Sequence, residues 1–166
     1  ALTEELGHAI VVVKTPGGMG TGWFCNPDGY VVTNHHVVAN ERSITVTAFR
    51  REEGRFEKEV FKKVKLIALD AQMDLALLKV EDEIEMEIPQ LDIGDSAEVK
   101  EGDNVFTIGN PMGLERSTAQ GIVSKVNRSF DGRLYIQTTA PISPGNSGGA
   151  LFNDRGQVIG VTNMGY

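Results

Sequence analysis

All three histidines of this chain, His8, His35 and His36, precede the serine that stands between glycines at position 147. The surrounding segment, Gly145-Asn146-Ser147-Gly148-Gly149, fits the pattern G-x-S-x-G, which in α/β-hydrolases forms the turn that carries the nucleophile. That fold requires its acid and then its histidine downstream of the serine. Because no histidine follows Ser147, the α/β-hydrolase fold and an esterase built on it are excluded.

The serine segment has two interpretations when it is taken alone. Glycines beside Ser147 allow a tight turn and let a substrate carbonyl group approach main-chain N–H groups, as an acyl-transfer nucleophile requires. Gly, Asn and Ser are also ordinary residues of a turn between two strands. The order along the chain favours the first interpretation, because histidine, then aspartate, then serine is the order of chymotrypsin-type double barrels.

The composition narrows the classes of partner and of chemistry. A net charge of −7 without a basic run argues against nucleic acid or an anionic membrane as the partner. The glycine-rich loops lack the lysine and the strand–helix setting of a phosphate site, so we expect no nucleotide and no other cofactor. No stretch has the length of a membrane span or the form of a signal peptide. The single cysteine, Cys25, is predicted to be a half-buried strand residue and a poor nucleophile.

Short apolar runs separated by turn residues predict an all-β fold of about a dozen strands. The turn signal Asn26-Pro27-Asp28-Gly29 predicts a hairpin between its two flanking runs. The segments 50–58 and 81–87 are charged and are predicted to be exposed connections, whereas 75–80 is almost continuously apolar and is predicted to be a central strand. The predicted strands cover 10–14, 22–25, 30–33, 43–49, 60–69, 75–80, 104–108, 118–126, 134–139, 150–153 and 157–162.

A general base for Ser147 has to come from His35 or His36, which follow the predicted strand over 30–33. Neighbouring side chains on an extended segment point to opposite faces, so only one of the two rings can face the serine. A vicinal histidine pair also suggests a metal site, but no other ligands lie at suitable spacing, and we expect no metal. For the acid that orients the imidazole, Asp74 opens the apolar strand, while Asp70 lies in a more polar turn and is predicted to be a surface cap.

Three segments, in this order, resemble the HtrA/Deg branch of the trypsin-like serine proteases. They are Thr33-Asn34-His35-His36-Val37-Val38, Asp74-Leu75-Ala76-Leu77-Leu78-Lys79-Val80 and Gly145-Asn146-Ser147-Gly148-Gly149-Ala150-Leu151, and the resemblance runs in register from about residue 11 to residue 166. It implies a catalytic triad of His36, Asp74 and Ser147, with an oxyanion hole formed by the main-chain N–H groups of Gly145 and Ser147. The implied function is a serine endopeptidase that cleaves unfolded or exposed polypeptide through an acyl-enzyme.

The resemblance also implies a chymotrypsin-like fold of two six-stranded antiparallel β-barrels, approximately residues 1–90 and 91–166. We expect the second barrel to be truncated at its C-terminus, because the sequence stops at Tyr166, before the last strand and helix of the family. Members commonly carry PDZ modules after the protease, and we expect a protease domain without a PDZ module here. The family suggests a homo-oligomer, commonly a trimer, and a location in the cell envelope or periplasm. Residues 1–9 lack the aromatic side chains that family trimers often use.

Specificity is expected to depend on residues just before the oxyanion turn, which form the floor of the S1 pocket in this architecture. In this chain they are Pro141, Ile142 and Ser143. None carries a carboxylate that could pair with a substrate Lys or Arg. We therefore expect a small or medium aliphatic residue at P1, with Ile142 as the main wall of the pocket.

Binding of the substrate main chain is expected at Val161, Thr162 and Asn163, which would accept the substrate as an added strand. As in the family, order in the loops 109–117 and 139–146 is expected to govern activity. The alternative function is a catalytically silent module of the same fold, which binds polypeptide without cleaving it, as a chaperone does.

Overall fold

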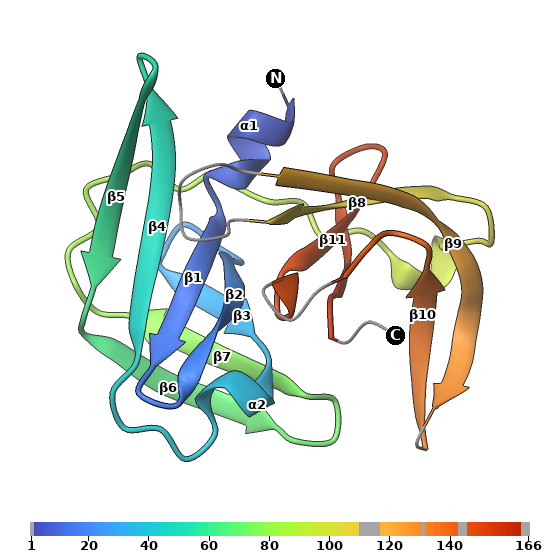
Figure 1. Cartoon of the computed structure of the whole chain (residues 1–166), viewed down its shortest axis with the longest axis horizontal. Helices are drawn as coiled ribbons and strands as arrows, with labels where there is room; N and C mark the ends of the chain where they lie inside the picture. The colour runs from blue at the N-terminus through green and yellow to red at the C-terminus, as the bar shows by residue number, and fades with distance from the viewer. Residues whose placement is uncertain (1, 110–116, 131, 143–145, 164–166) are drawn as a thin grey trace.

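The computed structural model describes residues 2–109, 117–130, 132–142 and 146–163, and it consists of two curled antiparallel sheets (Figure 1). The elements are α1 (Leu2–Gly7), β1 (Ile10–Thr15), β2 (Gly18–Phe24), β3 (Tyr30–Thr33), α2 (His35–Val38), β4 (Thr45–Glu52), β5 (Arg55–Phe61), β6 (Val64–Asp70), β7 (Leu75–Val80), the 3-10 turn η1 (Ser96–Glu98), β8 (Asn104–Gly109), β9 (Ser117–Phe130), β10 (Arg133–Thr138), β11 (Ala150–Asn153) and β12 (Val158–Val161). The first sheet has the strand order β5-β4-β1-β2-β3-β7-β6, and the second has the order β10-β9-β8-β11-β12. Each sheet forms a half-barrel, so the all-β, chymotrypsin-like fold class is confirmed.

The hairpin between β2 and β3 forms at the predicted turn. The side chain of Asn26 accepts a hydrogen bond from the main-chain N–H of Asp28 at 3.0 Å. Next along the chain, β3 pairs with β7, and the pairing ends at Thr33 opposite Ala76. The residues that follow β3 therefore lie beside those that precede β7, although the two segments are about forty residues apart in the sequence.

One hydrophobic cluster includes side chains from both sheets. Phe24 and Phe61 of the first sheet pack edge to face with ring centroids 6.4 Å apart. Phe152 of the second sheet belongs to the same buried cluster and stacks on Phe106 with centroids 5.1 Å apart. Burial of such side chains stabilises a fold by roughly 1.5–3 kcal/mol each. Because the two sheets share this cluster, they hold each other in a fixed relation.

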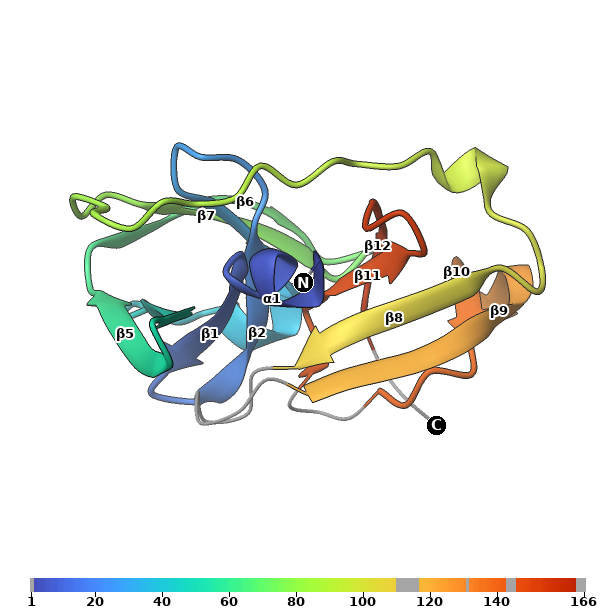
Figure 2. The same cartoon turned by 90° about the horizontal axis from the view of Figure 1, so that it is seen from above.

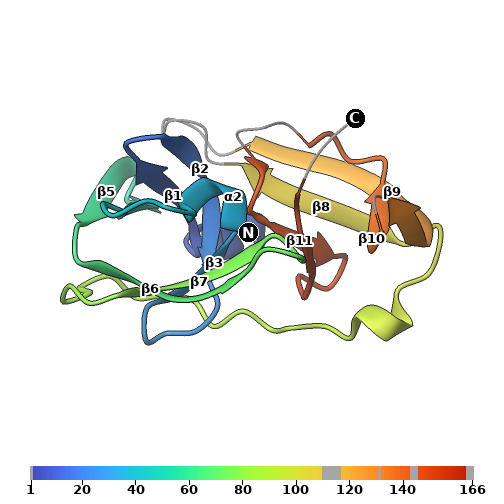
Figure 3. The ribbon, with the colours of Figure 1, turned by 90° about the horizontal axis from the view of Figure 1, so that it is seen from below.

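The connection between β7 and β8 runs along one side of both sheets (Figure 2). The predicted boundary between the two barrels, between residues 90 and 91, falls in this connection. This division into two barrels stays a prediction. Figure 3 shows α2 at the side of the first sheet that faces the second sheet. None of the helices in the described part of the chain is long and apolar enough to span a membrane.

The charged segment 50–58 belongs to a hairpin, and its prediction as a loop was wrong. Strands β4 and β5 stay paired as far as Glu52 and Arg55. The two residues between them, Glu53 and Gly54, have φ angles of 51° and 77°. Positive φ at both central residues is the type I′ geometry, whose twist matches that of a hairpin. The pattern of apolar residues does not indicate this part of the hairpin, because its exposed charged residues interrupt the apolar alternation that is typical of a strand.

Two predicted strand boundaries also differ from the structure. The strand predicted over 60–69 is interrupted at Lys62 and Lys63, whose main-chain N–H groups donate to the carboxylate of Asp82 at 3.4 and 2.8 Å. The strand predicted to begin at residue 22 begins at Gly18. The first difference accompanies hydrogen bonds to a side-chain carboxylate and the second the main-chain pairing of Gly18 with Thr15, and apolar periodicity reports neither.

Candidate active site

His36 and Asp74 meet where β3 and β7 end side by side. The ring Nδ1 of His36 lies 2.7 Å from Oδ2 of Asp74. The main-chain N–H of His36 donates to the other carboxylate oxygen, Oδ1, at 2.9 Å. The carboxylate is therefore held on both of its oxygens by one residue. The side chain of Asp74 is 12% exposed and that of His36 is 56% exposed, so the acid is covered while the ring reaches solvent.

The two histidines do not lie on an extended segment, and that prediction was wrong. His35–Val38 forms a helical turn, α2, directly after Asn34. Successive side chains of a helix point in directions about 100° apart around its axis. The rings of His35 and His36 therefore do not point to opposite faces, as they would on a strand. The helical turn also frees the main-chain N–H of His36, because the first N–H groups of a helix have no partner within it. That N–H group is the one that donates to Asp74.

Asp74 has a left-handed backbone conformation, with φ of +55°. This region is uncommon for residues other than glycine, although aspartate and asparagine adopt it more often than most. The main-chain carbonyl of Asp74 accepts a hydrogen bond from Nδ2 of Asn34 at 3.0 Å. Both the side chain and the main chain of Asp74 are thus fixed from the segment that carries His36.

Asn34 connects the acid to the serine segment. Its side chain is buried, with 1% of the residue exposed. While Nδ2 donates to Asp74, Oδ1 accepts a hydrogen bond from the Ser147 hydroxyl at an O···O distance of 2.5 Å. Sequence analysis placed Asn34 in a motif but assigned it no role. A signal was present, because an asparagine before a helical turn offers both a donor and an acceptor.

The segment around Ser147 is held against the first sheet by main-chain contacts. The carbonyl of Ser147 accepts from the N–H of Thr21, in β2, at 3.0 Å, and the N–H of Gly148 donates to the carbonyl of Thr162 at 2.8 Å. Gly148 has φ of +97°, and a Cβ atom at this position would lie 2.1 Å from the carbonyl oxygen of Thr21. Only glycine fits there, so the glycine after the serine is a steric requirement of this packing.

The Ser147 hydroxyl lies inside the molecule, and the residue is 5% exposed. Its oxygen also lies 2.5 Å from the main-chain carbonyl oxygen of Asn163, so Asn34 and Asn163 compete for its one hydrogen. Among the residues that the structure describes, its hydrogen bonds go to these two acceptors and not to the ring of His36. The four residues Ser147, Asn34, Asp74 and His36 form one continuous chain of hydrogen bonds.

The structure describes some of the other predicted site residues and not others. Gly145 and Ser143 lie outside the described residues, while Pro141 is exposed and Ile142 is half-buried. Val161 ends β12, which is an edge strand of the second sheet. The main-chain groups of Thr162 already bond within the serine segment: its N–H donates to Gly149 and its carbonyl accepts from Gly148. The carbonyl of Asn163 is likewise occupied, by Ser147.

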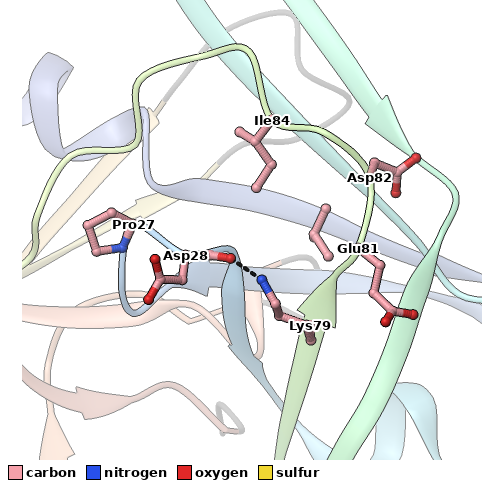
Figure 4. Close-up of a pocket in the computed structure, with 7 residues that line it drawn as sticks. Pro27, Asp28, Lys79, Glu81, Asp82 and Ile84 are labelled. Carbon is pink, nitrogen blue, oxygen red and sulfur yellow. Dashed lines mark hydrogen bonds between the residues drawn. The ribbon is translucent and has the colours of Figure 1, made fainter.

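A pocket of about 390 Å³ lies at the opposite end of β3 and β7 from His36 and Asp74 (Figure 4). It contains charged side chains of both signs, and Lys79 donates to the main-chain carbonyl of Asp28 within it. The ammonium of Lys79 also lies 5.1 Å from the ring centroid of Tyr30. With its lysine engaged in these structural contacts, the pocket offers no nucleophile and base in contact with each other.

Asp70 is exposed and Cys25 is half-buried, as the sequence predicts, but Asp70 ends β6 instead of lying in a turn, and Cys25 follows β2 instead of lying in a strand. Asp70 is exposed, and its Oδ1 accepts from the N–H of Met73 at 3.0 Å, as a surface cap does. Cys25 is half-buried, and burial raises the pKa of its thiol. A raised pKa lowers the thiolate fraction, so Cys25 is a weak nucleophile. No group of three or more His, Cys, Asp or Glu side chains in the described part of the chain is arranged to hold a metal ion.

The family model described as a trypsin-like peptidase domain matches residues 20–161, which include the histidine, aspartate and serine segments. The chain belongs to the trypsin-like peptidase family. A probable periplasmic serine endoprotease DegP-like of Pseudomonas fluorescens is 40% identical over 151 residues, covering 89% of this chain and 29% of that protein. A protein of the same description from Hahella chejuensis is 42% identical over 150 residues, covering 89% of this chain and 30% of that protein. The chain thus spans about three-tenths of the length of these curated relatives.

Two solved structures place this trypsin-like peptidase in the HtrA/Deg branch. The crystal structure of Deg5 is 30% identical, with a TM-score of 0.83, and the match covers 98% of this chain and 82% of Deg5. The HtrA-type protease AlgW with tripeptide is 32% identical, with a TM-score of 0.77, over 96% of this chain and 52% of AlgW. The resemblance to the HtrA/Deg type that the three sequence segments carry is confirmed.

Proposed function

We propose that this chain is the catalytic unit of a serine endopeptidase, with Ser147 as the nucleophile, His36 as the general base and Asp74 as the orienting acid. One observation carries the proposal. The His36 ring is held on a covered carboxylate at 2.7 Å, and the same carboxylate-bearing residue connects through Asn34 to a buried serine hydroxyl. A base oriented by an acid beside a serine is the arrangement that acyl transfer from a serine hydroxyl requires.

The proton pathway follows from the geometry at Asp74. The carboxylate of Asp74 accepts a hydrogen bond from Nδ1 of His36, so the neutral imidazole carries its proton on Nδ1. The lone pair on Nε2 is then available as the base. Nε2 takes the hydroxyl proton as the Ser147 oxygen bonds to the scissile carbonyl carbon. It then gives that proton to the leaving amine as the C–N bond breaks, which leaves an acyl-enzyme. Water then adds to the acyl carbon as the same ring takes its proton. The bond from this carbon to the Ser147 oxygen breaks, the ring returns the proton to that oxygen, and the carboxyl product leaves. The main-chain N–H groups of Gly145 and Ser147 would stabilise the oxyanion in both steps.

The proposed substrates are unfolded or exposed polypeptide segments. An extended segment can pair with a free sheet edge. Strand β12 is the last strand of the second sheet; residues 92–94 occupy its outer side at Val158, so the proposed edge is the part towards Val161. At P1 we expect a small or medium aliphatic residue, because Pro141, Ile142 and Ser143 include no charged side chain. A series of peptides that differ only at P1 tests this: faster cleavage after Val, Ala or Leu supports it, and faster cleavage after Arg or Glu contradicts it. Since the curated relatives are named periplasmic, the cell envelope is the proposed location.

A catalytically silent module that binds polypeptide is the second candidate. The position of the Ser147 hydroxyl favours it, because the hydroxyl bonds to Asn34 and Asn163 instead of to His36. In this candidate the buried hydroxyl is a structural group of the serine segment, and peptide would bind without forming a covalent intermediate.

A fluorophosphonate probe distinguishes the two functions. The probe phosphonylates an activated serine and releases fluoride, and mass mapping then locates the adduct. Labelling of Ser147 in the wild type, with none in Ser147→Ala or His36→Ala, supports the endopeptidase. The matched control is Asp70→Ala, which removes an exposed aspartate near Asp74 and should label like the wild type. Folded protein that binds peptide but takes no label would support the silent module.

A further inference from the structure

We propose that Asn34 is a positioning residue that holds the Ser147 hydroxyl away from His36, so that activation includes the transfer of one hydrogen bond from Asn34 to His36. The inference rests on the proposed function, and it identifies the contact that keeps the site at rest. It is carried by the 2.5 Å contact between the Ser147 hydroxyl and Oδ1 of Asn34.

The orientation of the Asn34 amide is determined by its second partner. The main-chain carbonyl of Asp74 can only accept, so the amide group that lies 3.0 Å from it has to be the NH₂ group. The amide oxygen is thereby directed at Ser147. This oxygen can only accept, so in a hydrogen bond between the two groups the Ser147 hydroxyl is the donor. The asparagine thus has one fixed orientation, in which its amide oxygen competes for the hydroxyl proton of Ser147.

The single hydrogen of a serine hydroxyl limits the partners that it can serve at once. Both of its acceptors, Oδ1 of Asn34 and the carbonyl of Asn163, lie at 2.5 Å. General-base activation requires that the same hydrogen is donated to Nε2 of His36. The contact with Asn34 and the activating contact with His36 therefore exclude each other.

Asn34 is well placed to act as a fixed element. It is 1% exposed, and the preceding residue, Thr33, is tied to the carbonyl of Thr21 through its hydroxyl at 2.8 Å. Asn34 occupies the N-cap position of α2, yet its side chain makes no capping hydrogen bond to that helical turn. Capping therefore does not account for an asparagine here, whereas the bridge between Asp74 and Ser147 uses both ends of its amide. Because Asn34 is fixed, we assign the change on activation to the Ser147 side, where the hydroxyl exchanges its acceptor.

The test compares two substitutions at Asn34 by the rate of fluorophosphonate labelling of Ser147 over a range of pH. Asn34→Ala removes the acceptor and the donor, while Asn34→Asp keeps an acceptor beside Ser147, replaces the donor to Asp74 by a second acceptor and adds a buried carboxylate. We expect Asn34→Ala to label about fivefold faster than the wild type at the pH plateau, the factor that one ordinary hydrogen bond is worth. Asn34→Asp should label no faster than the wild type. A purely structural role of Asn34 would make both variants slower.

The outcomes separate this inference from the function on which it rests. If the wild type labels and Asn34→Ala labels at the same rate or more slowly, the inference is wrong and the endopeptidase stands. If neither protein labels, the proposed function is wrong, and the inference falls with it.

A second measurement does not depend on Asn34→Ala folding. Ser147→Ala leaves the buried amide oxygen of Asn34 without its donor, so its Tm should fall by about 3–6 °C relative to the wild type. An unchanged or higher Tm would show that the hydroxyl does not hold this contact, and would overturn the inference.

Discussion

His36 and Asp74 are joined at two points, by the ring Nδ1 at 2.7 Å from Oδ2 and by the main-chain N–H at 2.9 Å from Oδ1. A single contact would leave the carboxylate free to rotate about it. The two contacts together fix the plane of the carboxylate relative to the ring, and they keep the proton of the neutral imidazole on Nδ1. The remaining ring nitrogen is then available as a base, which is the property that a hydrolytic function requires of this pair.

Asp74→Asn tests the orienting role of the acid without changing the size of the side chain. An amide presents either a donor or an acceptor to Nδ1, and in the donor orientation it selects the wrong tautomer of the ring. We expect kcat/KM for a peptide substrate to fall by about 10³–10⁴-fold, while the protein stays folded. The matched control Asp70→Asn should retain the wild-type value, because the side chain of Asp70 is exposed and accepts from the N–H of Met73, outside the candidate site. Equal losses in both variants would contradict the assignment.

Gly148→Ala tests the packing that places the serine. The new Cβ would lie 2.1 Å from the carbonyl oxygen of Thr21, at a residue with φ of +97°. We expect the free energy of unfolding to fall by more than about 3 kcal/mol, as measured by urea denaturation. Gly102→Ala is the matched control: its φ is +91° and nothing lies within 4 Å of its Cβ position, so only the backbone cost of about 1–2 kcal/mol remains. Similar losses at both positions would show that the contact with Thr21 has no consequence.

Lys79→Met tests whether the pocket in Figure 4 takes part in catalysis. The substitution removes the hydrogen bond to Asp28 and the ammonium beside the ring of Tyr30. We expect the free energy of unfolding to fall by about 1 kcal/mol, with kcat/KM unchanged within twofold. A large loss of kcat/KM in a protein of wild-type Tm would assign the pocket a role in the reaction.

Cys25 provides a prediction of pH dependence. Because burial raises the pKa of its thiol, less thiolate is present at any pH near neutrality than for a free cysteine. Alkylation by iodoacetamide at pH 8 should be at least about tenfold slower in the folded protein than in urea, and the folded rate should still be rising at pH 9. Rapid alkylation of the native protein at pH 7 would show a reactive thiol instead.

The sequence predicts most of the strands because apolar periodicity and turn residues report which faces are buried. The run over 75–80 and the run over 150–153 coincide with β7 and β11. The hairpin of β4 and β5 escapes this reasoning, since its solvated faces carry charges and its two-residue turn is Glu53-Gly54 instead of the more common Asn-Gly. The charged end of this hairpin leaves little trace in the pattern of side chains, whereas Val46, Ala48 and Phe61 farther from the turn are buried in the core.

The candidate site divides in a similar way. Residue type and order leave His35 and His36 open as the base, and the resemblance to the HtrA/Deg segments selects His36 together with Asp74 and Ser147. The structure brings His36 and Asp74 into contact. The sequence does not indicate that the Ser147 hydroxyl bonds to Asn34 and Asn163, because a hydroxyl chooses its acceptor by rotation of one side-chain bond. Whether His35 and His36 share an extended or a helical segment is likewise decided by the contacts of Asn34 and Asp74, which lie forty residues apart.

The most direct test of the account is whether His36, Asp74 and Ser147 act as one unit. The measurement is the rate at which an unfolded, fluorescently labelled protein is hydrolysed by His36→Ala, Ser147→Ala, Asp74→Ala and the triple variant. Residues that form one proton relay are strongly non-additive, so the triple variant should be no slower than His36→Ala or Ser147→Ala alone. Losses that multiply across the three positions, or a folded single variant at either His36 or Ser147 that keeps the wild-type rate, would contradict it.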